Sequence, residues 1–407
     1  MANPISFDNT EIAFAHKTRS ELQESHWLFK MMGNPWLVRL GTRLAPWSIK
    51  AGLPVNGIIR KTIFKQFVGG ESLEETSKVA VKLAQSNVQV ILDYGVEGKE
   101  GEAAFDNAQA EFIRVIKYAA TQPNIPYISI KVTGFARFSL LEKMDELMHA
   151  HAKESLMKSY NAALKILPQN EQVEWERVVS RMQKVCAFAN EARVGVLVDA
   201  EETWIQDPVD ALTMLMMDVY NKTVAVIYNT IQLYRHDRLT FLHRLYDAAV
   251  QRNFILGVKL VRGAYMEKER KRAEEKGYAS PIQQAKENSD KDYNEAIRFC
   301  IERIQKIAVI VASHNEGSNL LAATLMQEKG LPLNHPHLHF SQLYGMSDNI
   351  TYNLAKAGCS VSKYLPFGPI KDVVPYLMRR AQENTSVGGQ TSRELSLIKK
   401  ELTRRKM

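Results

Sequence analysis

The sequence has little cysteine and no long apolar segment. Its three cysteines, Cys186, Cys300 and Cys359, lie far apart in the chain and form no CxxC pair. This spacing argues against a zinc site or a disulfide framework and is typical of a protein from a reducing compartment. No apolar run reaches the length of about 18 residues that a membrane-spanning helix needs. The first 25 positions hold four acidic residues and no apolar core, which argues against a signal or transit peptide, so we expect a cytoplasmic protein.

Motifs for nucleotides and nucleic acids are also missing. No GxGxxG follows the first predicted strand, which counts against a dinucleotide-binding Rossmann domain. The net charge of +8 comes without an RNP, zinc-finger or helix-turn-helix signature, so nucleic acid is not an expected partner. Part of the charge lies in the C-terminal segment KKELTRRKM. Such a segment is either a solvated end or a contact with an anionic surface, and a peripheral membrane contact stays open.

The composition is that of an ordinary globular protein, with 45% hydrophobic and 24% charged residues in 407 positions. Residues 1–86 are predicted to form a helical N-terminal arm, in which Ser72 and Glu75 make a capping box for a helix that runs to about Asn87. Eight short apolar runs follow, mostly separated by segments of helical periodicity. In chain order they are VQVILDYGVEG, YISIKVTGF, VGVLVDAEE, TVAVIYNTIQLY, ILGVKLVRGAY, IAVIVASHN, HLHFSQLYGM and CSVSKYLPFG.

Eight strand–helix units over roughly 300 residues favour an α/β fold of the (β/α)8 TIM-barrel type over an open sheet. The barrel is predicted to occupy residues 87–390, with a basic tail at 391–407. A gap of about 60 residues between the second and third runs predicts two or three helices there instead of one.

Polar side chains stand at the end of nearly every predicted strand. Because all strands of such a barrel end at one face, these side chains are expected to meet at a single mouth. They are Lys131, Asp199, Gln232, Lys259, Arg262, Tyr265, His314, Asn315, Gln342 and Tyr364. Cations outnumber acids among them, which predicts a site for a carboxylate or a phosphorylated cofactor. No metal site is expected, because no carboxylate set completes a shell around the histidines, and no strand end pairs a serine or cysteine with a histidine.

Two adjacent arginines follow the last predicted strand, in the segment SKYLPFGPIKDVVPYLMRRAQENTS. Arg379 and Arg380 are suited to gripping a small carboxylate through forked hydrogen bonds. They are equally consistent with a solvated helix face, on which Glu383 pairs with either arginine at helical spacing.

Several of these segments together resemble the proline dehydrogenase family. They are FVGGES, VDAEE, VKLVRGAYMEKE, SHN, FSQLYGM, YLPFG and YLMRRAQEN, which occur in the family's order between about residues 60 and 390. The resemblance implies a distorted (βα)8 barrel whose last helix lies across the mouth. It implies FAD as cofactor, oxidation of L-proline to Δ1-pyrroline-5-carboxylate, and transfer of the electrons to a membrane quinone. The length of the chain implies the monofunctional form, with a separate pyrroline-5-carboxylate dehydrogenase acting next on the way to glutamate.

The resemblance also implies roles for individual residues. The proline carboxylate would be held by Lys131, Arg379 and Arg380, and its ring would be walled by Leu260, Tyr265, Leu343 and Tyr364. The residues expected to act in catalysis are Lys131, Asp199, Tyr265, Tyr364, Arg379 and Arg380. Contacts with the flavin would come from Asp199, Gln232, Lys259, Arg262, Gly263, Ala264, His314, Asn315, Gln342, Arg380, Glu383 and Ser386. Glu97 would gate the mouth by pairing with the first arginine, at a spacing about one residue from that of some relatives.

Alternatives stay open at several points. Asp199 is also placed to cap the helix predicted for EETWIQ, and His314 and Gln342 are also consistent with satisfied polar residues of the core. The function has two alternatives: a flavin oxidoreductase for hydroxyproline or another cyclic amino acid, and a non-catalytic, membrane-associated scaffold on the same fold. Tyr364 favours proline, because hydroxyproline-specialised relatives tend to lack a bulky tyrosine at this position.

Overall fold

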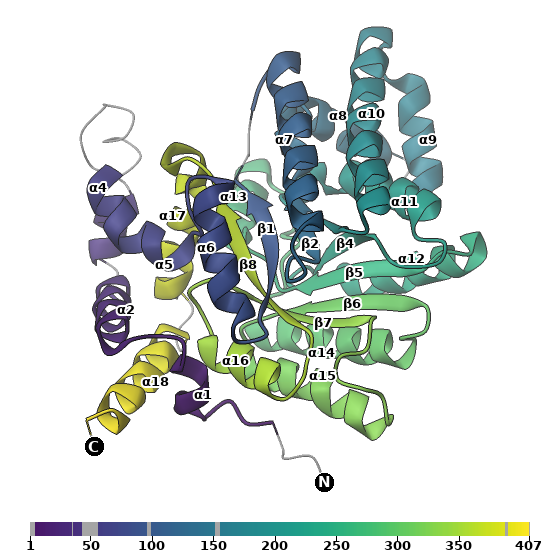
Figure 1. The fold of residues 1–407 in the computed structure, drawn as a ribbon. Coiled ribbons are helices and arrows are strands. Elements are labelled where there is room, and N and C mark those ends of the chain that lie inside the picture. The colour runs from purple at the N-terminus through teal and green to yellow at the C-terminus, as the bar shows by residue number, and fades with distance from the viewer. Residues whose placement is uncertain are drawn as a thin grey trace. The chain divides into compact units, whose positions relative to one another are not determined.

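The computed structural model describes residues 5–34, 36–42, 56–95, 99–150, 155–386 and 390–406. Its strands form one closed barrel in which β1 to β8 follow chain order (Figure 1). The strands are β1 Gln89–Tyr94, β2 Tyr127–Ile130, β3 Gly195–Val198, β4 Ile227–Gln232, β5 Leu256–Val261, β6 Ile307–Ala312, β7 Leu338–Leu343 and β8 Val361–Phe367. Each predicted apolar run supplies one strand, and the predicted (β/α)8 class is confirmed.

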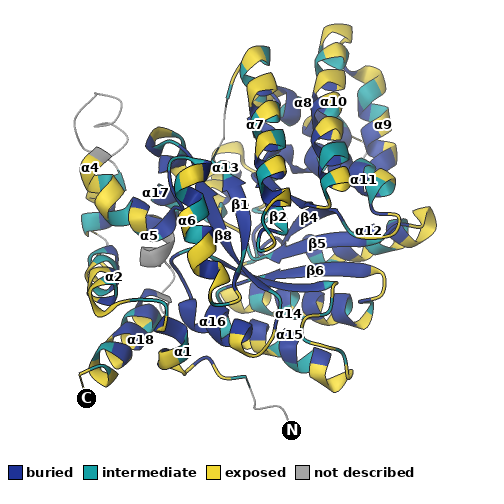
Figure 2. Ribbon diagram, viewed as in Figure 1, coloured by how far each residue is buried: buried dark blue, intermediate teal, exposed yellow. Residues whose placement is uncertain are grey.

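The strands are buried on both faces, which explains why the runs in the sequence are continuous. Every residue of β3 and of β8 is buried, and the strands stand out as dark ribbons in Figure 2. Parallel strands that helices cover on the outer face need apolar side chains at successive positions. Neighbouring strands run parallel, as in the pairs β3–β4 and β7–β8.

The chain divides into two compact units. Unit 1 consists of Met1–Gly95, His314–Leu320 and Phe340–Met407, and unit 2 consists of Val96–Ser313 and Leu321–His339. Among the described residues, no helix is both long enough and apolar enough to cross a membrane.

Unit 1 contains the predicted N-terminal arm and the predicted C-terminal tail together with β1, β8 and most of β7. Its helices are α1 Thr10–Phe14, α2 Arg19–Met32, α4 Asn56–Ile59, a π-helical turn Arg60–Phe64, α5 Lys65–Phe67, α6 Leu73–Ala84, α16 Asp348–Lys356, α17 Ile370–Ser386 and α18 Gln390–Arg404. Ser72 caps α6 as predicted, its hydroxyl accepting the Glu75 N–H at 3.3 Å. The predicted capping box is incomplete, because the Glu75 carboxylate accepts the Glu71 N–H at 3.0 Å and not that of Ser72. The helix ends at Ala84, a few residues earlier than predicted, because Asn87 adopts a left-handed φ of 57°.

The segment predicted as a basic tail forms most of helix α18, which lies beside α1 and α2 in unit 1 (Figure 1). Leu397 and Ile398 of α18 are buried in a core cluster with Phe14 of α1 and Phe29 of α2. The Arg405 guanidinium donates to the Phe14 and Lys17 carbonyl oxygens, each at 2.7 Å. Part of the positive charge of this segment therefore serves contacts inside the protein.

Unit 2 holds β2 to β6 and a full set of covering helices. They are α7 Glu102–Ala120, α8 Phe138–His149, α9 Leu156–Ile166, α10 Gln169–Ala192, α11 Gln206–Tyr220, α12 Arg238–Arg252, α13 Met266–Lys276 and α14 Lys286–Glu302, with short 3-10 turns at Val132–Gly134 and Thr203–Ile205. Helix α15, Glu316–Glu328, begins in unit 1 and continues into unit 2. Three helices, α8 to α10, fill the long gap between the second and third strands, as predicted.

Candidate functional site

Two lysines and one aspartate predicted for the site meet in unit 2. Lys131 directly follows β2, Asp199 directly follows β3, and Lys259 lies within β5. One carboxylate oxygen of Asp199 lies 3.6 Å from the Lys131 ammonium group. The other accepts hydrogen bonds from the Lys259 ammonium group and, at 2.7 Å, from the Ser129 hydroxyl. We call Lys131, Asp199 and Lys259 the lysine–aspartate cluster.

The lysine–aspartate cluster is buried and carries more positive than negative charge. The side chains of Lys131, Asp199 and Lys259 are only 8%, 12% and 6% exposed. Burial alone would raise the pKa of Asp199, but the ammonium groups of Lys259 and Lys131 outweigh it and hold this pKa below its usual value. Two ammonium groups thus face one carboxylate, and a small anion is the ligand that such an arrangement attracts. The alternative that Asp199 caps a helix fails, since Glu202 is the N-cap residue of the turn that follows.

Gln232, the last residue of β4, offers a buried acceptor. Its amide nitrogen donates to the Glu201 carbonyl oxygen at 2.8 Å. Its Oε1 atom is buried and has no hydrogen-bond partner among the described residues. A buried acceptor without a donor is costly, so this atom suits a ligand that presents an N–H group, as the ring of a flavin does.

The segment Arg262–Ala264 follows β5 and is held by both side chain and backbone. The Arg262 Nε atom donates to Asp290 at 2.7 Å, and the Arg262 carbonyl oxygen accepts the Tyr234 N–H at 2.8 Å. Gly263 has a φ of 145°, and a Cβ added there would lie 2.3 Å from the Tyr234 ring. Only glycine therefore allows this turn, which leaves Gly263 and Ala264 exposed directly after the strand.

His314 and Asn315 lie in unit 1, between β6 and α15. The His314 Nδ1 atom lies 2.8 Å from the Ser347 hydroxyl oxygen. Asn315 accepts the Ser318 N–H through its side-chain oxygen at 2.9 Å, which caps the start of α15. Both side chains are half-buried and held in place by these bonds.

Gln342 does not fit its predicted contact with a cofactor. Its register partner on β8 is Lys363, whose ammonium group contacts Asp348 of α16 at 2.9 Å on the helix side of the barrel wall. Gln342 accepts from the Thr351 hydroxyl of α16 at 2.8 Å and donates to Asn319 of α15 at 3.3 Å. The prediction is corrected: Gln342 is a core polar residue that connects two helices.

Leu260 does not fit its predicted place in the wall of a substrate pocket. Successive side chains of a strand point to opposite faces, and the neighbouring Lys259 points to Asp199. Leu260 therefore points toward the helices and is removed from the set of wall residues. Tyr364 keeps its place in that set, because it lies on the face of β8 opposite to Lys363 and is paired in register with Leu343.

The two arginines lie on helix α17 in unit 1. Arg380 is only 6% exposed, and its guanidinium carbon lies 5.1 Å from the centre of the Tyr376 ring. Arg379 is half-buried. This burial argues against the alternative of a solvated helix face. Other predicted residues fall outside what the structure describes: Glu97 entirely, and Glu383 and Ser386 in their side chains.

The buried acids that the sequence analysis did not single out include Asp93 and Glu201, which follow or end barrel strands. Asp93 of β1 is buried and pairs in register with Pro366, two residues beyond Tyr364 on the same face of β8. Glu201 is buried after β3, and the Thr133 hydroxyl contacts both of its carboxylate oxygens at 2.8 and 3.0 Å. Both acids stand at the ends of predicted strands, in VQVILDYG and VDAEE. The rule that selected Lys131 and Asp199 could have found them.

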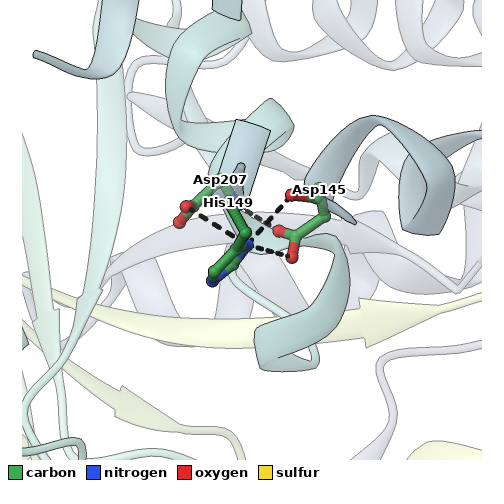
Figure 3. Close-up of side chains that lie close together, drawn as sticks. All are labelled: Asp145, His149 and Asp207. Carbon is green, nitrogen blue, oxygen red and sulfur yellow. Dashed lines mark hydrogen bonds and ion pairs between the residues drawn. The ribbon is translucent and has the colours of Figure 1, made fainter. Parts of the chain in front are cut away.

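A separate cluster in unit 2 joins Asp145, His149 and Asp207 (Figure 3). The His149 Nδ1 atom lies 3.1 Å from the Asp145 carboxylate and 4.0 Å from that of Asp207. The same nitrogen lies 2.9 Å from the Asp145 carbonyl oxygen, which can only accept, so Nδ1 carries a proton and cannot bind a metal. The hydrogen bond with Asp145 raises the pKa of His149 to about 9. The cluster is an ion pair of an imidazolium with two carboxylates.

We expect His149→Asn to lower the free energy of unfolding at pH 6 and to have no effect near pH 10. The pKa of His149 rises from 6.5 to about 9 on folding. The ion pair therefore contributes fully below pH 6.5, and its contribution disappears as the pH rises through about 9. Because His149 is 59% exposed, solvent screening limits the effect to about 0.5–1 kcal/mol. Urea unfolding of both proteins at the two pH values measures it, and an equal difference at both values would contradict the ion pair.

In a comparison with models of protein families, residues 76–393 of this chain match the proline dehydrogenase model. Among curated proteins, the chain is 34% identical to the carbapenem antibiotics biosynthesis protein CarD of Pectobacterium carotovorum, over 90% of this chain and 91% of CarD. It is 31% identical to mitochondrial proline dehydrogenase 1 of Dictyostelium discoideum, over 99% of this chain and 75% of that protein. It is 32% identical to the hydroxyproline dehydrogenase of Xenopus laevis, over 98% of this chain and 90% of that protein.

The fold is similar to that of proline utilization A (PutA) from Bdellovibrio bacteriovorus, with a TM-score of 0.71 and 20% identity. The match covers 95% of this chain and 40% of the PutA chain, so the chain spans less than half of that protein. The PutA match supports the fold, and the family model spans most of the sequence. The chain belongs to the proline dehydrogenase family of oxidoreductases.

Proposed function

We propose that this chain oxidises L-proline to Δ1-pyrroline-5-carboxylate, with FAD as its cofactor. The observation that carries the proposal is the lysine–aspartate cluster, in which two buried ammonium groups face one carboxylate at the ends of barrel strands. Membership in the proline dehydrogenase family supports the choice of substrate. Proline carries a carboxylate on an otherwise apolar ring, and the candidate residues offer cations together with the buried Tyr364 and the partly buried Leu343.

The binding of the substrate is proposed to rest on charge at one end and apolar contact at the other. Lys131, Arg379 and Arg380 hold the carboxylate, since one point charge and two planar forks fix the orientation of a small anion. The ring methylenes pack on Tyr265, Leu343 and Tyr364.

Asp199 is proposed to position the lysines and not to accept a proton. A carboxylate whose pKa is held below its usual value is a weak base at neutral pH. Its hydrogen bonds with Lys259 and Ser129 fix one oxygen, and Lys131 lies beside the other. The Asp199 side chain therefore positions the ammonium groups of Lys131 and Lys259.

FAD would be held by residues that present acceptors, cations and exposed backbone. The proposed set is Gln232, Lys259, Arg262, Gly263, Ala264, His314, Asn315 and Arg380. It omits Gln342 and Asp199, whose side chains bind other residues of the protein, and Glu383 and Ser386, whose side chains lie outside the described residues. When bound, FAD supplies the acceptor for the hydride that leaves C5 of proline. The buried Oε1 atom of Gln232, which has no partner among the described residues, is the observation that favours a flavin ring.

We expect the purified protein to be yellow and its flavin absorbance to be bleached by L-proline without oxygen. Bleaching follows if proline delivers a hydride to the bound cofactor. The measurement is an anaerobic titration followed by absorbance, with D-proline as the stereochemical control. A colourless protein that takes up no FAD, or a flavin that L-proline leaves oxidised, would sink the proposal.

A hydroxyproline oxidoreductase is the second candidate, because a hydroxyproline dehydrogenase is about as similar to this chain as a proline dehydrogenase. Tyr364 favours proline: the side chain is nearly buried and would crowd a ring hydroxyl. The same titration with trans-4-hydroxy-L-proline separates the candidates. Faster bleaching of the flavin by hydroxyproline than by proline would make the hydroxyproline oxidoreductase the favoured function.

A quinone is proposed as the final electron acceptor, with a peripheral contact to the membrane that holds it. Four exposed large apolar side chains support this contact: Trp27, Trp36, Leu40 and Ile58 of unit 1. Trp27 and Trp36 are 54% and 67% exposed, and tryptophan favours the interface between lipid and water. Basic residues of the same segment, such as Arg39 and Lys61, suit an anionic lipid surface.

A further inference from the structure

Ser347 joins two parts of unit 1 that are far apart in the sequence. It is fully buried and immediately precedes α16, with a left-handed φ of 51° that is uncommon for a residue other than glycine. Its hydroxyl oxygen lies 2.8 Å from the Nδ1 atom of His314, and its N–H donates to the carboxylate of Glu394. The unusual backbone conformation of Ser347 thus accompanies two specific hydrogen bonds.

Glu394 and its neighbour Arg393 lie on the C-terminal helix α18 and bind the starts of two other helices. Glu394 accepts the N–H of Ser347, the residue before α16. The Arg393 Nε atom donates to Glu316, the first residue of α15, at 2.9 Å. Asn349 of α16 donates to the same Glu316 oxygen at 2.8 Å. His314 lies two residues before Glu316. Helix α18 is therefore linked to His314 in two ways: through Ser347, which Glu394 binds, and through Glu316, which Arg393 binds.

The buried carboxylate of Glu394 lies at the start of helix α16, where a negative charge is stabilised. The start of a helix carries a partial positive charge, so a carboxylate at the start of α16 is favourable. Burial, and then the nearby charge of Asp348, raise the pKa of Glu394 to about 7, while the Ser347 N–H and the ammonium groups of Lys363 and Lys17 oppose this rise. Removal of the carboxylate leaves the buried backbone N–H of Ser347 without this acceptor, which is unfavourable.

We propose that Ser347 and Glu394 are positioning residues that hold the His314 ring in the orientation in which it contacts the cofactor; this rests on the proposed role of FAD. Glu394 fixes the backbone of Ser347, Ser347 fixes the ring of His314, and Arg393 fixes the helix that follows His314. The family model ends at residue 393, so Glu394 lies just outside the matched part of the chain. Helix α18 thereby gains a function beyond packing.

The first experiment uses the protein without cofactor. Hydrogen–deuterium exchange of the amides in residues 313–319 is compared among the wild type, Glu394→Ala, Glu394→Gln and Glu401→Ala. We expect exchange about 10-fold faster in Glu394→Ala, and near-normal exchange in Glu394→Gln because its amide oxygen still accepts from Ser347. Glu401 is the matched control: it is equally buried on α18, but its partners are Arg404 and Arg405. Unchanged exchange in Glu394→Ala, or equally faster exchange in Glu401→Ala, overturns the proposal.

The second experiment measures FAD affinity by quenching of flavin fluorescence. Ser347→Ala keeps the N–H that Glu394 binds and removes only the hydroxyl that contacts His314. We expect the Kd for FAD to rise about 5- to 10-fold in Ser347→Ala and Glu394→Ala, and to stay unchanged in Glu401→Ala. Faster exchange without any change in FAD affinity overturns the link to the cofactor. If the wild type itself binds no FAD, the proposed function fails, and the exchange data alone decide whether the two residues position His314.

Discussion

Replacement of Arg380 by methionine is expected to raise the KM for L-proline about 100-fold or more while the protein stays folded. Charge-assisted hydrogen bonds contribute about 1.5–3 kcal/mol each, and a forked guanidinium makes two of them to one carboxylate. The arginine is 6% exposed and lies against Tyr376, so its position is set before substrate arrives. Arg379→Met is expected to raise KM less, since this residue is half-buried. Steady-state kinetics with an artificial electron acceptor measure both effects.

Two further variants test whether the effect of Arg380 comes from its planar guanidinium, from its positive charge alone, or from a general disturbance of helix α17. Arg380→Lys keeps the positive charge and loses the planar fork, so its KM should lie between those of the wild type and Arg380→Met. Lys371→Met removes an exposed cation from the first turn of the same helix and should leave KM unchanged. A wild-type value of kcat/KM for L-proline in both Arg379→Met and Arg380→Met would rule out a carboxylate clamp on α17.

The barrel was predictable from the sequence because its strands are covered on both faces. Continuous apolar runs such as VGVLVD and the segments between them reveal the number and order of the strands. Polar residues at the ends of these runs stand out against apolar neighbours. Lys131, Asp199 and Lys259 were found in this way, and the structure brings them into contact.

The same burial hides which way each strand residue points. A strand with one wet face alternates between polar and apolar residues, but a strand buried on both faces does not. Nothing in KLV or SQL shows that Leu260 and Gln342 point toward helices while their neighbours Lys259 and Leu343 point to the opposite face of their own strands. That information lies in the register with neighbouring strands and in partners such as Thr351.

The role of the C-terminal helix could not be predicted for a different reason. Its basic residues have the composition of a solvated tail, and their partners are distant in the sequence: Arg405 binds the carbonyl oxygens of Phe14 and Lys17. Glu394 likewise is one acid among many until the fold places it beside Ser347. Contacts between the two ends of a chain leave no periodic signal in either end.

Asp199→Asn is expected to lower the free energy of unfolding by about 3 kcal/mol at neutral pH, the largest loss that we predict for a single change of charge. The substitution removes the buried carboxylate that both the Lys131 and the Lys259 ammonium groups contact, and breaking a buried ion pair in this way typically costs 3–5 kcal/mol. The lowered pKa of Asp199 means that this stabilisation is present above about pH 3.8 and is lost only as the pH falls through that lower pKa. Urea unfolding at neutral pH measures the loss.

A double-mutant cycle distinguishes the loss of charge balance from a general disturbance of the barrel. Removing one ammonium group as well, in Asp199→Asn with Lys259→Met, should recover part of the lost stability, because the remaining cluster then holds one buried charge instead of two. Asp218→Asn is the control for a partly exposed ion pair, with Lys222 and Arg252 as partners, and should cost less than about 1 kcal/mol. Additive effects of Asp199→Asn and Lys259→Met would show that the two side chains do not interact. A coupling of about 1 kcal/mol or more would show that Asp199 and Lys259 stabilise each other in the folded protein.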